Sequence, residues 1–541
     1  FNTVRLAEFA WGLLEPEPDR CDFAWLDRAV DVLNAHGLRV VLSTPTAAPP
    51  PWLLAAHPDI AQVDEQGRRV GPGTRREACA NHPVYQERSR RIVEQMAAHY
   101  GHHPGVIGWQ TDNEFGCHDS ARCYCPHCQA AFRAWLQEKF THVDTLNRAW
   151  GGAFWGEVYT SWEEIPLPTR SRAQRNPSHL LDFQRFSSDV WRRYHAQQIA
   201  ILRRRCPNHF VTHNLMGFFP DLNAYHLCEG LDFVSWDNYH YFGATPATVA
   251  ASHDHMRGVL RRNFWVMEQQ AGQINWSVYN PAPPPNFVRL KTYQAIAHGG
   301  DGVIYFRWRQ ARAGSEQYHS GLLDHAGRTT AGYEEARQIG AELQRLAPML
   351  AGTAPRPKVA ILLDYDSRWV LEEQPHNQLL RMNQPPDFVL PHPVLLMDRE
   401  DEPDERFMTG RAWLAWQFLA PYIALWEDNI PADIVAPEAD LTGYRVVLAP
   451  FLNLLRPAVV SNLRRFVQAG GALILGPRSG LKDEHNRLFT TPQPGPLTEL
   501  TGSTVRFFDS LSPERSNELR WQESVTRMGR VSPVGFWAEV L

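Results

Sequence analysis

Two glutamates stand near the ends of apolar runs that are typical of β-strands. Glu114 directly follows the run 106–113, and Glu268 ends the run 264–268. A barrel of parallel strands presents its catalytic side chains at the carboxyl ends of the strands. Two such carboxyl groups can break a sugar linkage: one protonates the departing oxygen while the other attacks or stabilises the anomeric carbon. The pattern therefore predicts glycosidic-bond chemistry if both runs end in one pocket.

Each glutamate also has a simpler structural interpretation. Glu114 could cap a helix that follows it, and Glu268 could form a salt bridge with an arginine inside the barrel mouth. Asn113 favours the chemical interpretation, because an amide beside the acid can donate to a sugar 2-hydroxyl as charge develops on the neighbouring carbon. Other acids compete for the two roles, since they also lie at or just past strand ends: Glu8, Asp112, Asp237 and Glu316. The sequence alone does not rank these six acids.

A dense group of cysteines predicts a metal site. Cys123, Cys125 and Cys128 lie within six residues, and such a loop can supply three thiolates to a tetrahedral zinc ion. The alternatives are reduced structural thiols or a local disulfide. By spacing alone the fourth ligand is open: Cys117, His118, His127 or a distant residue. All eight cysteines precede residue 229, and this clustering favours a reducing, cytoplasmic location over a disulfide scaffold.

The elements that must position these residues alternate between strand and helix over residues 1–350. This alternation predicts a parallel sheet whose connections are helices. Seven runs are typical of strands: 4–9, 38–43, 106–113, 210–215, 233–239, 264–268 and 303–308. The longest amphipathic stretches between them are 23–36, 84–100, 179–206 and 245–262. We expect an eight-stranded (β/α)8 barrel and a fragmentary sequence, in which the first strand and helix, and any leader, precede Phe1.

A second domain is expected over residues 356–541. Residues 358–363, 444–449 and 472–475 are typical of strands, and 457–468 of a helix, so an open α/β sheet similar to flavodoxin or amidotransferase folds is predicted. It contains no cysteine and hence no nucleophile of the amidotransferase kind. We expect this domain to serve assembly.

Composition excludes several classes of partner. A formal net charge of -5 gives no electrostatic reason to expect nucleic acid or an anionic membrane, and a neutral substrate is expected. No run of about 18 apolar residues is present, so no membrane span is predicted. The 19 tryptophans offer flat faces for sugar rings, although most are expected in the core.

Several of these motifs together resemble glycoside hydrolase family 42, the β-galactosidases. The likeness rests on residues 109–114, the cysteine group, 264–270, Asn275, Trp276, 308–310, Glu316 and His319, and it continues from Pro357 to the end of the chain. It implies that Glu114 is the general acid/base, that Glu268 is the nucleophile and that configuration is retained. Retention requires the two carboxyl groups about 5 Å apart.

The same resemblance implies a galactose pocket, a complete zinc shell and an oligomer. The pocket would consist of Arg76, Asn113, Trp155, Tyr239, Trp276, Glu316 and His319. In this pocket Trp276 would pack against one face of the sugar ring, and Glu316 and His319 would bind adjacent hydroxyls. Arg76 would hold Glu268 ionised. Cys79 would join Cys123, Cys125 and Cys128 around a structural zinc ion, no organic cofactor would be needed, and the second domain would support a homotrimer.

The sequence therefore predicts a retaining β-galactosidase. A rival within the same class is a barrel glycosidase for another sugar, such as an α-L-arabinopyranoside, which matches galactose except for the missing hydroxymethyl group. A rival from another class is a carbohydrate-binding protein that has lost its activity; the presence of both glutamates argues against it.

Overall fold

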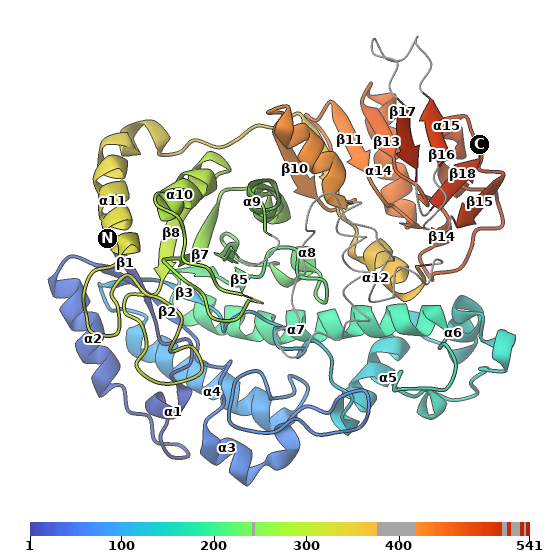
Figure 1. The fold of residues 1–541 in the computed structure, drawn as a ribbon. Helices are drawn as coiled ribbons and strands as arrows, with labels where there is room; N and C mark the ends of the chain where they lie inside the picture. The colour runs from blue at the N-terminus through green and yellow to red at the C-terminus, as the bar shows by residue number, and fades with distance from the viewer. Residues whose placement is uncertain are drawn as a thin grey trace.

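Parallel strands and covering helices build the first 350 residues, as the sequence predicts (Figure 1). The structure is a computed structural model that describes residues 1–240, 244–277, 279–375 and 418–510, together with the backbone of 517–520, 531–534 and 537–540. The strands of this part are β1 (Thr3–Leu6), β2 (Arg39–Ser43), β3 (Val106–Gln110), β4 (Phe210–Thr212), β5 (Asn214–Leu215), β6 (Ser235–Asn238), β7 (Phe264–Gln270) and β8 (Gly300–Phe306).

These strands form two parallel four-stranded sheets, in the orders β1-β2-β3-β4 and β5-β6-β7-β8. Only His213 separates β4 from β5, so the two sheets continue one another and the pair corresponds to the single predicted strand 210–215. All seven predicted strands are confirmed, with ends that differ by a few residues. Within the described part of the chain, β1 and β8 flank the arc and do not pair with each other. The architecture is that of a (β/α)8 barrel.

Close backbone contacts and helix caps explain the local geometry. A Cβ atom on Gly108 in β3 would lie 2.3 Å from the Phe210 ring, so only glycine lets the β4 side chain cross at this point. Asn176 caps the longest helix, because its side chain accepts from the backbone N–H groups of Ser178 and His179 while Pro177 occupies the first helical position.

Helices connect the strands and cover the outside of the barrel (Figure 1). The four predicted amphipathic stretches are confirmed as α2 (Ala24–Ala35), α4 (Pro83–Tyr100), α7 (Pro177–Arg205) and α9 (Pro246–Leu260). The remaining barrel helices are α1 (Trp11–Leu14), α3 (Pro51–Ala56), α8 (Ala224–Leu227), α10 (Phe287–Ala297), α11 (Ala331–Leu350) and the short 3-10 helix η1 (Pro58–Ile60).

An insertion between β3 and α7 forms its own small core. It contains α5 (Pro126–Phe140), α6 (Val143–Trp150), η2 (Gly152–Trp155) and η3 (Trp162–Glu164). Phe132, Trp135 and Trp150 pack there with the four cysteines and with Phe183 and Phe186 of α7. The insertion is therefore anchored to the barrel through α7.

The second part contains a parallel sheet in the order β10-β9-β11-β13. Its strands are β9 (Val359–Leu362), β10 (Ala432–Val435), β11 (Val446–Ala449) and β13 (Ala472–Leu475), and its helices are α12 (Tyr365–Glu373), α14 (Pro457–Gln468), α15 (Thr498–Thr501) and the 3-10 helix η5 (Gly495–Leu497). Three short pairs follow: β12 (Leu454–Leu455) with β14 (Lys482–Asp483), β15 (Phe507–Ser510) with β18 (Trp537–Val540), and β16 (Asn517–Arg520) with β17 (Val531–Val534). The predicted open sheet is confirmed, whereas β10 was not predicted. Residues 376–417 of the predicted second domain lie outside the described residues.

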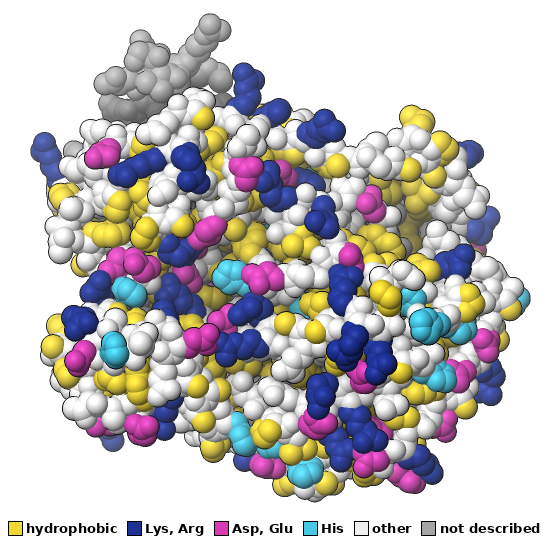
Figure 2. Space-filling model, turned by 180° about the vertical axis from the view of Figure 1, so that it is seen from behind, with side chains coloured by type: hydrophobic (Ala, Val, Ile, Leu, Met, Phe, Trp, Pro, Cys, Tyr) yellow, Lys and Arg dark blue, Asp and Glu magenta, His cyan; other side chains and the backbone are white. Residues whose placement is uncertain are grey.

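Ion pairs join the second sheet to the barrel helices. Arg257 of α9 binds Asp433 of β10 at 2.7 Å, and Arg185 of α7 binds Asp366 of α12 at 2.7 Å. On the face shown in Figure 2, basic and acidic side chains alternate, without a large area of one sign. Among the described helices, none has the length and apolar character to cross a membrane.

Candidate active site

Most of the predicted site residues line one large cavity at the carboxyl ends of the barrel strands. Its volume is about 1060 Å³. Both predicted catalytic glutamates line it, as do Arg76, Tyr239, Trp276, Glu316 and His319. Glu8 and Asp237, two of the competing acids, also reach this cavity. The geometry of each carboxylate must therefore distinguish its role.

Glu268 is buried within β7, where two hydrogen-bond donors hold its carboxylate. The guanidinium of Arg5 lies 2.6 Å from Glu268 Oε1, and the Tyr239 hydroxyl donates to Oε2 at 2.5 Å. Burial alone would raise the pKa of Glu268, but the charge of Arg5 and the hydrogen bond from Tyr239 lower this pKa below its usual value. Glu268 is consequently ionised at neutral pH, as an attacking carboxylate must be. The salt bridge expected from the simpler interpretation is present. It keeps this carboxylate ionised, and Glu268 still lines the cavity.

Glu114 follows β3 on a turn with an unusual backbone. Asp112 and Glu114 adopt φ values of 52° and 44°, in the left-handed region, which sends the chain into the cysteine-rich loop. Glu114 therefore does not cap a helix, because the next helix begins only at Pro126. The Asn113 side-chain amide donates to Glu114 Oε2 at 3.1 Å, and Arg75 Nη1 lies 3.4 Å from the same oxygen.

A polar network connects the two glutamates beneath the cavity. Arg5 donates to Gln110 at 2.9 Å, and the Gln110 amide reaches Asn113 Oδ1 at 3.5 Å, so the partners of Glu268 and Glu114 touch one another. Asn214 donates to Asn113 Oδ1 at 2.9 Å, and its side-chain oxygen accepts from the backbone N–H of Glu114 at 3.2 Å. The network fixes both carboxylates relative to a single rigid set of strands.

Asp237 is a third carboxyl group in this network, with different electrostatics. It accepts from Asn214 at 2.6 Å, while its Oδ1 atom is buried without a hydrogen-bond partner among the described residues. Burial, and then the negative charges of Glu268 and Glu114, raise the pKa of Asp237 well above its usual value. The shift disfavours the anionic form of Asp237, whereas the pKa of Glu268 is shifted in the opposite direction, and this separates Asp237 from Glu268 as a nucleophile.

The remaining competing acids each lie beside an arginine. Glu8 binds Arg5 at 3.1 Å, and Glu316 lies 3.5 Å from Arg307. Asp112 is fully buried against Arg76 and does not line the cavity.

Arg76 does not hold Glu268 ionised, and this part of the prediction is wrong. Its guanidinium pairs with the Asp112 carboxylate and donates to the Asn113 carbonyl, and it lies over the rings of Phe115 and Trp191. Arg5 takes the predicted role, because β1 directs its side chain across the barrel mouth. The residue next to Arg76, Arg75, is the one that reaches Glu114.

Aromatic and imidazole side chains form one wall of the cavity. The Tyr239 ring meets Trp276 edge-on with a centroid distance of 5.3 Å, and His319 packs 5.1 Å from Phe306. His319 is buried, and neither of its ring nitrogens has a hydrogen-bond partner within the described chain. Burial and the positive charge of Arg307 lower the pKa of His319 to about 4, despite an opposing effect of Glu268. A neutral imidazole therefore faces the cavity, able to donate from one nitrogen and accept at the other.

Trp155 and Asn113 lie outside the lining of the cavity. Asn113 is buried directly beneath it, in contact with Glu114. Trp155 ends η2 in the insertion, with 63% of its surface exposed, and its ring contacts that of the exposed Phe154 at an interplanar angle of 47°. The structure thus does not bring Trp155 to the cavity of its own chain.

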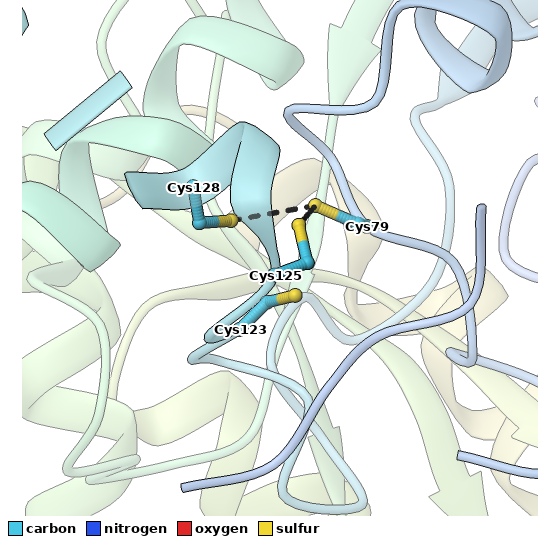
Figure 3. Close-up of side chains that lie close together, drawn as sticks. All are labelled: Cys79, Cys123, Cys125 and Cys128. Carbon is cyan, nitrogen blue, oxygen red and sulfur yellow. Dashed lines mark hydrogen bonds between the residues drawn. The ribbon is translucent and has the colours of Figure 1, made fainter. Parts of the chain in front are cut away.

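The four cysteines predicted as ligands meet in one buried cluster (Figure 3). Cys79 Sγ lies 3.6 Å from Cys125 Sγ and 3.4 Å from Cys128 Sγ, and all four sulfurs lie within 4.8 Å of one another. Zinc bound to four thiolates at about 2.3 Å places its sulfurs about 3.8 Å apart, so the cluster fits a tetrahedral ion. Cys117 is buried outside the cluster, and the four sulfurs are free thiols. Of the fourth ligands left open by spacing, the distant Cys79 is the one that completes the cluster.

A barrel with an ionised carboxylate on one strand, and a second carboxyl group after another strand that lines the same cavity, defines the class of barrel glycosidases. The family model for glycoside hydrolase family 42, described as beta-galactosidase, matches residues 1–346, and the model described as the beta-galactosidase trimerisation domain matches residues 357–538. The chain belongs to glycoside hydrolase family 42.

Individual relatives agree with this assignment. A beta-galactosidase from Thermus thermophilus is 42% identical over 558 residues, which cover 99% of this chain and 79% of that protein. Beta-galactosidase Bga from Halorubrum lacusprofundi is 41% identical and covers 99% of this chain and 75% of that protein. The solved structure of a polyextremophilic beta-galactosidase from the same haloarchaeon superimposes with a TM-score of 0.88 at 39% identity, covering 100% of this chain and 77% of that one.

Proposed function

We propose that this protein is a retaining β-galactosidase that releases terminal, non-reducing β-D-galactose. The observation that carries the proposal is the cavity shared by Glu114 and an ionised Glu268. Family 42 membership and relatives named beta-galactosidase over nearly the whole chain support the choice of sugar.

The reaction proceeds by two displacements. Glu268 attacks the anomeric carbon while Glu114 donates its proton to the glycosidic oxygen, so the aglycone leaves as a neutral alcohol and a galactosyl ester remains on Glu268. Glu114, now a carboxylate, removes a proton from water, and the resulting hydroxyl attacks the same carbon and frees Glu268. Two inversions give overall retention.

The side chains around the two glutamates suit these steps. Tyr239 donates to Glu268 Oε2, and burial followed by the charges of Glu268 and Asp237 raises the pKa of Tyr239 well above its usual value, so it remains a donor. Asn113 donates to Glu114 from beneath the cavity and would orient this acid, while a bond to the sugar 2-hydroxyl would require its second amide N–H to reach the cavity. Trp276 would pack on the sugar ring, and His319 and Glu316 would bind its hydroxyls.

A panel of chromogenic glycosides tests the substrate. The β-galactoside should be hydrolysed with the highest kcat/KM. Hydrolysis of an α-L-arabinopyranoside, β-glucoside or β-xyloside with a higher kcat/KM would overturn the choice of galactose. Galactose binding measured without any hydrolysis would support a binding protein instead.

The other assignments concern structure rather than chemistry. Cys79, Cys123, Cys125 and Cys128 would hold a zinc ion with a closed shell of four thiolates, which pins the insertion beside Glu114 and leaves no position for a reacting water. A reducing compartment such as the cytoplasm would keep these thiols available. Residues 1–350 would carry catalysis, and residues 356–541, matched by the trimerisation model, would support a homotrimer.

A further inference from the structure

A second group of metal-binding side chains lies beside the cysteine cluster. His82 immediately precedes α4, His127 lies in the first turn of α5, and Asp59 belongs to η1. One potential ligand atom from each of the three lies within 4.8 Å of the others. We propose that Asp59, His82 and His127 form a second metal site, selective for a divalent transition ion such as Zn²⁺, distinct from the four-cysteine site.

The spacing of the three side chains fits such an ion. His82 Nε2 lies 3.1 Å from Asp59 Oδ2, and two ligands bound at about 2.0–2.1 Å to a tetrahedral metal lie about 3.3 Å apart. A metal ion can therefore replace the proton that His82 and Asp59 now share, with little movement of either group. The His127 ring lies 4.5 Å from the His82 ring between centroids, at an interplanar angle of 69°. His127 is only half-buried, so it can approach by a small side-chain rotation.

The burial of His82 is a separate sign of a ligand site. This imidazole is 2% exposed, yet its Nδ1 atom has no hydrogen-bond partner among the described residues. Burial holds the ring with Nε2 directed at Asp59, which is the orientation that an ion bound between these two groups requires. Nδ1 would then carry the proton of the neutral imidazole.

The cysteine cluster would organise the second site in advance. His82 is three residues after Cys79, and His127 directly precedes Cys128, so two segments of the chain each carry ligands of both sites. Asn81, between Cys79 and His82, donates to Cys128 Sγ at 3.2 Å and links the two segments again. Because the segments that carry His82 and His127 are held in this way, a site with only three protein ligands gains affinity from preorganisation.

The donor set indicates the chemistry. Two imidazoles and one carboxylate suit zinc, copper or nickel rather than magnesium or calcium, which prefer oxygen ligands. Three protein ligands leave one coordination position for water, unlike the closed shell of four thiolates. The bound ion would join η1, the residue before α4 and the first turn of α5.

Cobalt binding to the full-length protein distinguishes the two sites. With zinc retained at the cysteines, added Co²⁺ should bind to about one further equivalent and give weak d–d absorption without a sulfur-to-metal charge-transfer band. His127→Ala and Asp59→Asn change exposed or half-exposed residues and should weaken this binding by at least about tenfold. Zn²⁺ added at saturating concentration should raise the Tm of the unaltered protein but not that of either variant.

His103→Ala is the matched control. His103 Nε2 also lies 3.2 Å from an aspartate, Asp31, but this pair is not part of a three-ligand group among the described residues. Cobalt binding should be unchanged in this variant. The proposal is overturned if the unaltered protein takes up no cobalt beyond the cysteine site, if His127→Ala binds it equally well, or if His103→Ala loses it. None of these readouts depends on galactoside hydrolysis, so the result is independent of the proposed function.

Discussion

Arg5 on β1 and Glu268 on β7 form a buried ion pair of 2.6 Å across the mouth of the barrel. Arg5 also binds Glu8 and Gln110, so one guanidinium connects the proposed nucleophile to the strand that leads to Glu114. This arrangement explains how a carboxylate can stay ionised in a buried place, and it leads to a prediction about pH.

Replacing Arg5 should shift the acidic limb of the pH profile. Glu268 must be ionised to attack, and because its pKa is lowered in the folded protein, activity is present above that pKa and lost as the pH falls through it. In Arg5→Gln the favourable charge is absent, so the acidic limb of kcat/KM should move upward by about one pH unit or more. Arg5→Lys should show a smaller shift.

Arg39→Gln serves as the control for this shift. Arg39 lies on the neighbouring β2 but is exposed and donates only to the Pro104 carbonyl at 3.0 Å. An unchanged acidic limb in Arg5→Gln, or an equal shift in Arg39→Gln, would rule out the proposed role of Arg5.

Removing the Glu268 carboxylate should abolish hydrolysis and open the site to an external nucleophile. We expect Glu268→Ala to lose at least about 10⁴-fold in kcat. Azide added to this variant should yield the α-galactosyl azide, because it attacks from the vacated face. Glu8→Gln, which alters another carboxylate in the same cavity, should give no azide product; identification of the azide adduct in both variants or in neither contradicts the assignment.

Loss of Glu114 should depend on the leaving group. A dinitrophenyl galactoside needs no protonation as it departs, whereas the glucose unit of lactose does. Glu114→Ala should therefore lose much less activity on the first step with the dinitrophenyl substrate than with lactose. Measured single-turnover rates that fall equally for both substrates would exclude the acid role.

The cysteine cluster predicts a metal that resists gentle chelation. Cys123→Ser should lose the tightly held zinc and show a lower Tm, since a structural metal contributes directly to folding stability. Cys117 is buried but lies outside the cluster, so Cys117→Ser should keep the bound zinc and the Tm of the unaltered protein. Elemental analysis after dialysis checks this in the His127→Ala background, where the proposed second site contributes no zinc, and a full equivalent of zinc in Cys123→Ser there would refute the ligand set.

The periodic features of the sequence were sufficient to predict the fold. Strands such as 38–43 and helices such as 179–206 carry their signal locally, in apolar runs and amphipathic periods. Glu114 and Glu268 could be placed at strand ends because their apolar runs are strong, but the choice of these two among six acids came from the family resemblance. The short β10 was missed because Asp433 interrupts its apolar run, whereas β9, β11 and β13, equally short, are apolar throughout.

The partners of these glutamates could not be predicted so readily. The interaction of Arg5 with Glu268 joins β1 to β7 across the barrel. Asn214 meets Glu114 only after β4, which leads into β5, has paired with β3. The run 4–9 contains two charged residues, Arg5 and Glu8, and a basic residue within a predicted barrel strand was the signal that could have identified Arg5. Arg76 and Arg75 are adjacent, and the left-handed backbone of Arg76, with φ of 67°, decides which guanidinium reaches Glu114.

The stereochemistry of the first-formed product tests the central claim most directly. If Glu268 forms a covalent galactosyl intermediate that water resolves with the help of Glu114, proton NMR recorded within the first moments of hydrolysis should show β-galactose, followed by slow mutarotation to the α anomer. Initial release of α-galactose would require a single inverting displacement by water and would contradict the account.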